Sequence, residues 1–164
     1  MDALNSNVDF TKTDRDTQLA FRGTPRRVLF NPGDRVYRFT SLPDETFAGN
    51  EIFKSPWWQP HRTFNAIVRT ANRTSSSIVD TARSGLAVNR KWNPSMEWLV
   101  IVELTGSVYG WVGRTRHQPA EGSDRSVLLM GNFTQVFLPG LAGGGDGNSS
   151  PFGFICYHGS IAGV

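Results

Sequence analysis

The second half of the chain carries one β-strand pattern after another, with no helical pattern between them. Apolar or alternating runs cover residues 98–104, 107–113, 127–138 and 152–158, and the third run is expected to bend at Gly131. Parallel strands need a long crossover, usually a helix, between successive strands. The uninterrupted succession therefore disfavours a parallel α/β fold and favours a mainly antiparallel sheet.

The first half adds strands and a helical segment. Residues 35–40 alternate between two faces, and Arg38 lies on one of them. Residues 42–60 contain several prolines and are expected to form a loop, whereas apolar residues recur at helical spacing over residues 61–88. We therefore expect an α+β fold with a mainly antiparallel sheet or a split β-sandwich, in which a helical segment follows the first strand.

The length of 164 residues matches one ordinary domain. Aromatic residues make up 12% of the chain, which argues against disorder. Residues 1–24 are polar and without period, so we expect a flexible N-terminal arm there and a single globular domain over residues 25–164. The glycine-rich stretch 143–150 is expected to be a flexible loop.

Charge and cysteine content limit the classes of partner. The net charge is +3, and most basic residues are arginine, which suits bidentate binding of phosphate or carboxylate. No basic run resembles a nucleic-acid-binding tail, although nucleic acid is not excluded. The single Cys156, expected to pack as a small apolar side chain, excludes an intrachain disulfide and a multi-cysteine zinc site, and no metal is expected. No segment resembles a signal peptide or a membrane span, so we expect action in the cytoplasm without a membrane partner.

Polar and aromatic residues in unusual places are the candidates for a site. Arg38, next to Tyr37, either grips a phosphate or carboxylate in a cleft or lies on a solvent face. Gln135 is an amide inside an apolar strand, where an unpaired amide costs about 1–3 kcal/mol. Trp57 and Trp58 are adjacent and cannot easily both be buried. One of them either stacks on a planar ligand ring or anchors the loop to the core.

These pieces resemble ADP-ribosyltransferase-fold enzymes, and in particular bacterial NAD-glycohydrolase toxin domains. Such enzymes open with an aromatic–arginine strand, continue with a serine-bearing segment, and end with strands that carry a catalytic Glu or Gln. The matching pieces are residues 36–39, residues 82–87 and residues 133–139. The pairing of residues 110–118 with residues 131–135 is similar to the late Gly/Gln pattern of these toxins.

The resemblance implies that NAD⁺ is the substrate. Arg38 would hold the phosphates or ribose of NAD⁺, and Gln135 would stand where the family places its catalytic Glu or Gln. Ser84 would be the counterpart of the pocket serine. The other expected substrate-binding residues are Tyr37, Trp57, Trp58 and Gln118.

The chain departs from the transferase pattern beside Gln135. The transferase signature has a Glu two residues after its first Glu or Gln, but position 137 here is Phe. This departure favours hydrolysis of the nicotinamide–ribose bond over ADP-ribosyl transfer to a protein target. The resemblance further implies a toxin or effector that acts in the cytosol, is delivered by a specialised secretion route, and has an immunity protein as inhibitor.

Two other functions remain open from the sequence. A non-catalytic binding or interaction domain would show an exposed apolar patch around Trp57 and Trp58, without a deep pocket. An RNase-type hydrolase would use a pair among His61, His117 and His158 for acid–base chemistry, which requires two of them to lie close together.

Overall fold

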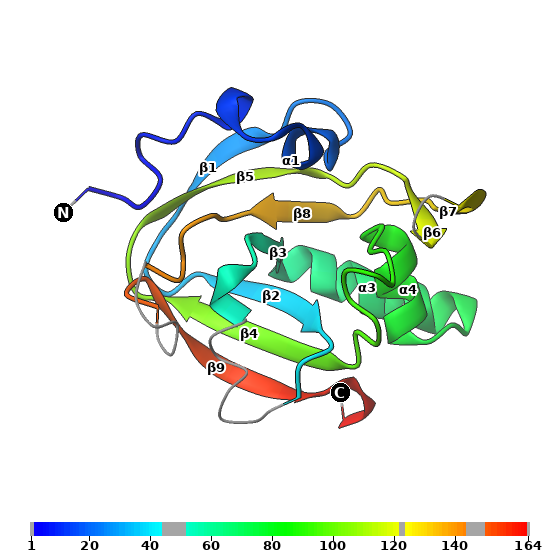
Figure 1. The fold of residues 1–164 in the computed structure, drawn as a ribbon. Coiled ribbons are helices and arrows are strands. Elements are labelled where there is room, and N and C mark those ends of the chain that lie inside the picture. Colours follow the sequence, from blue (N-terminus) through cyan, green and yellow to red (C-terminus); the bar gives the residue numbers. More distant parts are fainter. Residues whose placement is uncertain (1, 44–51, 122–123, 144–149, 164) are drawn as a thin grey trace.

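Seven strands form one sheet in the order β1-β5-β8-β3-β2-β4-β9, and all pairs of neighbouring strands are antiparallel. The computed structural model describes residues 2–43, 52–121, 124–143 and 150–163 (Figure 1). The expected α+β class with a mainly antiparallel sheet is confirmed. The large sheet consists of β1 (Arg26–Phe30), β2 (Arg35–Thr40), β3 (Trp57–Pro60), β4 (Trp98–Leu104), β5 (Val108–Arg114), β8 (Thr134–Phe137) and β9 (Gly153–Ser160), and a separate hairpin consists of β6 (Gln118–Glu121) and β7 (Asp124–Leu129).

The large sheet is split between β2 and β3. These strands pair only through Val36 with Pro60 and Tyr37 with Gln59. Beyond Tyr37, β2 stays paired with β4 as far as Thr40, whereas β3 pairs with β8. The sheet therefore divides into the half β1-β5-β8-β3 and the half β2-β4-β9, which lie one above the other in Figure 1.

The helices form where the helical spacing predicted them. In α3 (His61–Thr74), Thr63, Ile67 and Ala71 recur every four residues and are buried. This helix ends at Thr74. Helix α4 (Ile78–Gly85) begins after Ser77, whose hydroxyl accepts a hydrogen bond from the Asp80 amide at 2.9 Å. Both helices cover the apolar face of β2 that carries Tyr37 and Phe39, as one of the buried clusters shows.

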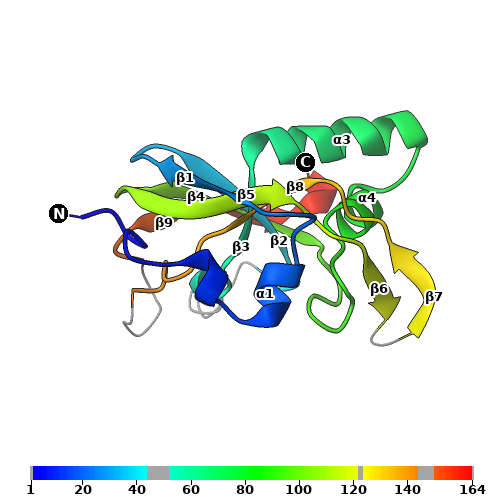
Figure 2. The same cartoon turned by 90° about the horizontal axis from the view of Figure 1, so that it is seen from above.

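The N-terminal segment, expected to be a flexible arm, instead packs along the sheet. It contains the short 3-10 helix η1 (Phe10–Lys12) and helix α1 (Arg15–Leu19), which lies on the opposite side of the strands from α3 in Figure 2. The amide of Leu4 donates to the Ser107 carbonyl at 2.9 Å. Phe21 is 3% exposed and lies in a cluster with Trp111. The aromatic side chains of the N-terminal segment hold it against the sheet, although the average composition of the segment is polar.

Three other local expectations differ from the structure. Residues 127–138 do not form one bent strand, because Gly131 has a φ of +68° and the chain turns there from β7 in the hairpin to β8 in the large sheet. Residues 57–60 form a strand, although the flanking prolines indicated a loop. Cys156 is exposed, because it lies at a register shift on the edge strand β9. The expected loop at 143–150 falls largely on residues 144–149, which lie outside the described residues.

The end of α4 is joined to the large sheet through Gly85. Its carbonyl accepts hydrogen bonds from the Phe133 amide at 3.0 Å and from the Thr115 hydroxyl at 2.8 Å. A Cβ atom at Gly85 would lie 1.8 Å from Cδ2 of the Phe133 ring. The close approach of helix and ring therefore requires glycine at this position.

We expect Gly85→Ala to lower the free energy of unfolding by about 1–3 kcal/mol, although alanine is the better helix former. The reason is the collision with Phe133, which must move out of its packing site. Urea unfolding followed by circular dichroism measures the change. Ser84→Ala, one residue earlier in the same helix, serves as the control and should change stability by less than about 0.5 kcal/mol. Equal stability of both variants would contradict the packing argument.

Candidate active site

A cavity of about 570 Å³ lies where β2 and β3 separate. Its volume is within the range of small-molecule sites. Arg38 lines it from the β2 half of the sheet, and Trp57, Gln59 and Gln135 line it from the β3–β8 half. Helix α1, the loop after α4, and the chain between β5 and β6 supply most of the remaining wall. The split in the sheet therefore brings together residues from distant parts of the chain.

Arg38 is held at the split by backbone and aromatic contacts. Its Nη1 donates to the Ile52 carbonyl at 2.6 Å, and its Cζ lies 5.9 Å from the ring centre of Trp58. The side chain is partly buried, so its charge is less screened by solvent than that of a surface arginine. A guanidinium in this position suits a phosphate or carboxylate ligand.

Two glutamines lie side by side on the cavity wall. Trp58 pairs with Val136, so the next residues along the two strands, Gln59 and Gln135, are neighbours on one face of the sheet. The Nε2 of Gln135 donates to the Ala20 carbonyl at 3.1 Å. The Oε1 of Gln59 is buried and has no hydrogen-bond partner among the described residues. The cavity wall thus contains one amide that is tied to the backbone and one whose oxygen is unpaired.

Two indole rings contribute to the lining. Trp57 is partly buried, and its ring centre lies 5.7 Å from that of Phe21 and 5.1 Å from that of Phe137. These aromatic neighbours fix the orientation of the indole. Trp92 is 66% exposed and lies on the loop after α4. The rigid ring of Trp57 therefore offers a stacking surface for a planar ligand.

The loop after α4 is held by a buried arginine. Arg83 is 6% exposed, and its guanidinium donates to the carbonyl groups of Val88 at 3.1 Å, Asn93 at 3.0 Å and Pro94 at 2.8 Å. Burial lowers the pKa of Arg83, and the nearby charge of Arg90 lowers it further. Val88 and Asn93 line the cavity, so Arg83 shapes the site without belonging to its wall.

Helix α1 contributes another part of the cavity wall, and its N-terminal cap residue, Asp14, fixes its first turn. The Asp14 carboxylate accepts hydrogen bonds from the Thr17 amide at 2.9 Å and the Thr17 hydroxyl at 2.6 Å, and these bonds lower the pKa of Asp14. The cap is therefore charged and formed at neutral pH. Thr17 and Asp16 both line the cavity.

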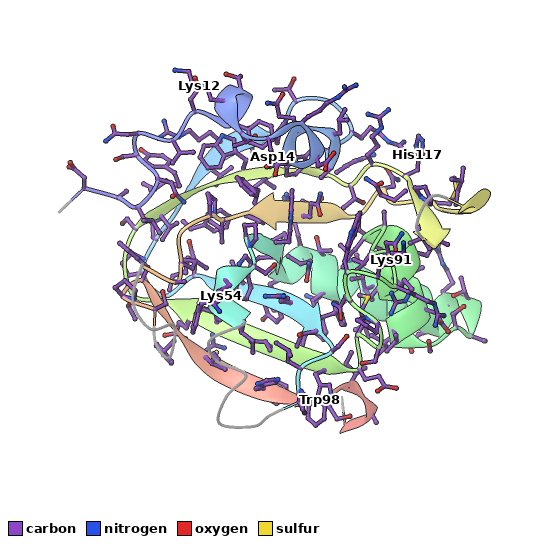
Figure 3. The ribbon with its side chains drawn as sticks, in the orientation of Figure 1. Lys12, Asp14, Lys54, Lys91, Trp98 and His117 are labelled. Atoms are coloured by element: carbon purple, nitrogen blue, oxygen red, sulfur yellow. The ribbon has the colours of Figure 1, made fainter. Side chains whose placement is uncertain are left out.

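Among the described residues of the lining, positive charge exceeds negative charge. The described lining residues include two guanidinium groups, those of Arg38 and Arg116, and one carboxylate, that of Asp16. Figure 3 shows Lys91 and His117, the sequence neighbours of the lining residues Trp92 and Gln118, at the end of the molecule that carries α4 and β6. This balance favours an anionic ligand.

Four of the seven site residues expected from the sequence line the cavity, and three do not. Tyr37 is buried under α3, where it stacks on His61 and Phe64 with ring centres 5.2 and 5.4 Å apart. Trp58 is fully buried in the core, and Ser84 lies on α4 outside the lining. The residues that line the cavity are Arg38, Trp57, Gln118 and Gln135.

Several lining residues were not expected from the sequence. Gln59 carries the same signal as Gln135, an amide within a strand, but the prolines around it indicated a loop. Asp16 lies in the segment expected to be a flexible arm, so it gave no signal. Asn93 and Arg116 lie in loops, where polar residues are ordinary.

None of the three histidines is among the described residues that line the cavity, although His117 lies between the lining residues Arg116 and Gln118. His61 stacks on Tyr37, and the Nε2 of His158 lies 2.8 Å from the Leu42 carbonyl oxygen. Within the described ranges, no group of three or more His, Cys, Asp or Glu side chains is arranged to hold a metal ion. In the same part of the chain, no helix has the length and apolar character needed to cross a membrane.

Comparisons with known proteins identify similar folds. No family model matches the chain, and no curated protein matches it. The solved structure of Rhs1-CT in complex with its cognate immunity protein RhsI1 is similar with a TM-score of 0.54 and 15% identity, covering 86% of this chain and 84% of that one. Tne2, solved in complex with Tni2, is similar with a TM-score of 0.50 and 14% identity, covering 85% and 95%. At these identities the similarity establishes a shared fold.

Proposed function

We propose that the chain cleaves the nicotinamide–ribose bond of NAD⁺ and transfers the ADP-ribosyl group to water. One observation carries the proposal: Arg38, Gln135 and the indole of Trp57 line the same cavity. The three residues come from three different strands, β2, β8 and β3. Their meeting in one cavity is what the resemblance to ADP-ribosyltransferase-fold enzymes implies, and it supports the proposal.

Each of the three residues has a role that matches the substrate. The Arg38 guanidinium binds the pyrophosphate of NAD⁺, which carries the negative charge. The indole of Trp57 stacks on the nicotinamide ring. The Nε2 of Gln135 donates to the Ala20 carbonyl, which orients the amide. Its oxygen can then accept a hydrogen bond from a ribose hydroxyl.

The chemistry requires positioning more than acid–base catalysis. When the bond between ribose C1′ and the pyridinium nitrogen breaks, its electron pair leaves with neutral nicotinamide, and the ribose becomes oxocarbenium-like. Water adds to C1′ and loses a proton, which yields ADP-ribose. The protein contributes by fixing the ribose, binding the pyrophosphate and limiting access of bulk water.

Hydrolysis is favoured over transfer to a protein because the strand of Gln135 has no carboxylate. Phe137 stands two residues after Gln135 and is buried at 6% exposure. Its side chain packs with Trp57 and Trp111 and so supports the wall of the cavity. An acceptor hydroxyl or amine therefore finds no neighbouring general base on this strand.

We further propose that the domain is a toxin or effector that is neutralised by a protein inhibitor. The fold similarity to Rhs1-CT, which was solved with a cognate immunity protein, supports this. The net charge of +3 makes an acidic inhibitor the best electrostatic match. Such a protein would act on NAD⁺ in the cytosol of a cell that lacks the inhibitor.

The two alternative functions find less support in the site. A binding module was expected to expose an apolar patch at Trp57 and Trp58, but Trp58 is 0% exposed and Trp57 faces a cavity. A nuclease that uses two histidines needs them at its active site, and no histidine is among the described residues that line the cavity.

The test is NAD⁺ consumption by the purified protein, followed by the release of nicotinamide and ADP-ribose. Gln135→Ala is expected to lower kcat/KM by about a hundredfold, because the ribose loses an oriented hydrogen bond. Asn65→Ala removes an exposed amide on α3 outside the lining and serves as the control. Thermal unfolding confirms that both variants fold. The absence of NAD⁺ cleavage by the unchanged protein would overturn the proposal.

A further inference from the structure

One amide in the cavity wall has an oxygen without a partner. Gln59 is 6% exposed and lines the cavity, and its Oε1 accepts no hydrogen bond from any described residue. Most buried carbonyl oxygens in proteins accept a hydrogen bond, because an unpaired one loses its hydration without replacement. The residue lines the cavity while the oxygen itself is shielded, so a rotation of the terminal amide brings this unpaired acceptor to a donor that comes with the ligand.

The position of Gln59 limits which part of a ligand it contacts. Gln59 follows Trp57 by two residues in β3, so both side chains project from the same face of the strand. Both line the cavity. A planar ring stacked on the Trp57 indole therefore has one edge toward Gln59. A substituent on that edge lies next to the Gln59 amide.

On the basis of the proposed function, we propose that Gln59 recognises the carboxamide of the nicotinamide ring. Its Oε1 accepts a hydrogen bond from the carboxamide N–H₂. The terminal torsion of a glutamine side chain is broad, so the amide turns its oxygen toward the ligand without a movement of β3. Gln59 is then the residue that determines which pyridine ring the site accepts.

The carboxamide is a better partner for Gln59 than the ribose hydroxyls. An amide N–H₂ group only donates, so it needs an acceptor in the site, whereas a hydroxyl donates and accepts and is satisfied in more ways. Gln135, the neighbouring amide, has its Nε2 fixed by the Ala20 carbonyl and is assigned to the ribose. The two glutamines thus divide the substrate between them.

The test compares two substrates in the unchanged protein and in Gln59→Leu. The second substrate is 3-acetylpyridine adenine dinucleotide, in which a methyl group replaces the amide N–H₂. We expect the unchanged protein to prefer NAD⁺ in kcat/KM, and Gln59→Leu to reduce this preference by roughly tenfold. The ratio of the two preferences cancels the different leaving-group reactivity of the two pyridines. A purely structural role for Gln59 would lower kcat/KM for both substrates equally.

The melting temperature gives a second readout. Leucine removes the unpaired oxygen at similar volume, so Gln59→Leu should melt at the same temperature as the unchanged protein or higher. Gln135→Leu, which breaks the hydrogen bond to Ala20, should melt at a lower temperature. A clear fall in the melting temperature of Gln59→Leu would contradict the conclusion that the Gln59 oxygen makes no stabilising hydrogen bond in the free protein. Gln59→Met carries the same substrate comparison if the leucine variant does not fold.

The outcomes separate the two proposals. If the unchanged protein does not cleave NAD⁺, the proposed function is overturned and the assignment of Gln59 falls with it. If the unchanged protein cleaves NAD⁺ and Gln59→Leu keeps the same substrate preference, the assignment of Gln59 alone is overturned. A lost preference together with a retained melting temperature supports it.

Discussion

The Arg38→Lys variant is expected to cleave NAD⁺ with kcat/KM lowered by about a thousandfold. Lysine keeps the positive charge but loses the planar fork that binds two phosphate oxygens at once. It also cannot reproduce the geometry of the hydrogen bond from Arg38 Nη1 to the Ile52 carbonyl, so the charge is displaced from the split in the sheet. Steady-state kinetics with NAD⁺ measure the loss.

The chain offers a matched control for this variant. Arg35 lies on the same strand, is exposed, and forms a surface ion pair with Glu103 at 2.9 Å. Surface ion pairs contribute about 0–1 kcal/mol, so Arg35→Lys should leave both stability and activity nearly unchanged. Equal kinetics of Arg38→Lys and the unchanged protein would contradict a phosphate-binding role for Arg38. Equal losses in both variants would show a general effect of replacing an arginine on β2, and would also contradict a specific role for Arg38.

The Arg83→Met variant is expected to lose about 3–5 kcal/mol of unfolding free energy, which is a large part of the stability of a typical domain. Methionine fills much of the same volume but leaves the carbonyl groups of Val88, Asn93 and Pro94 without their donor. The loop that these residues form borders the cavity, so NAD⁺ cleavage should fall as well. Urea unfolding and the activity assay measure the two effects.

Arg90 provides the corresponding control. It is an exposed residue of the same loop, and its charge disfavours the charged form of Arg83. Arg90→Met therefore removes a repulsion and should leave stability within about 0.5 kcal/mol of the unchanged protein. A stable Arg83→Met variant would show that the loop keeps its shape without the buried guanidinium.

The strands and helices that the sequence predicted are those with a strong local period. The strand at residues 98–104 has the same bounds as β4, and the alternating residues 35–40 have the same bounds as β2. The helical stretch 61–88 contains α3 and α4. These elements follow from the spacing of apolar side chains, which a single strand or helix imposes on its own residues.

Other elements depend on contacts between distant residues. The N-terminal segment packs because Phe10 and Phe21 meet Trp111 and Phe137, more than 80 positions away in the sequence. Strand β3 forms although Pro56 precedes it and Pro60 is its last residue, because β2 and β8 pair with it. Local composition does not show which distant residues will pack against a segment. It therefore indicated a flexible arm at residues 1–24 and a loop at residues 42–60.

The sequence by itself determined the α+β class, the order of its main elements, and the unusual polar character of Arg38 and Gln135 within apolar strands. Only the tertiary structure decided that these side chains share a cavity with Trp57 and Gln59, and that Tyr37 and Trp58 belong to the core instead. The physical reason is that a period of two assigns a side chain to a face, whereas the site arises where two strands stop pairing. That separation depends on every strand that packs around it.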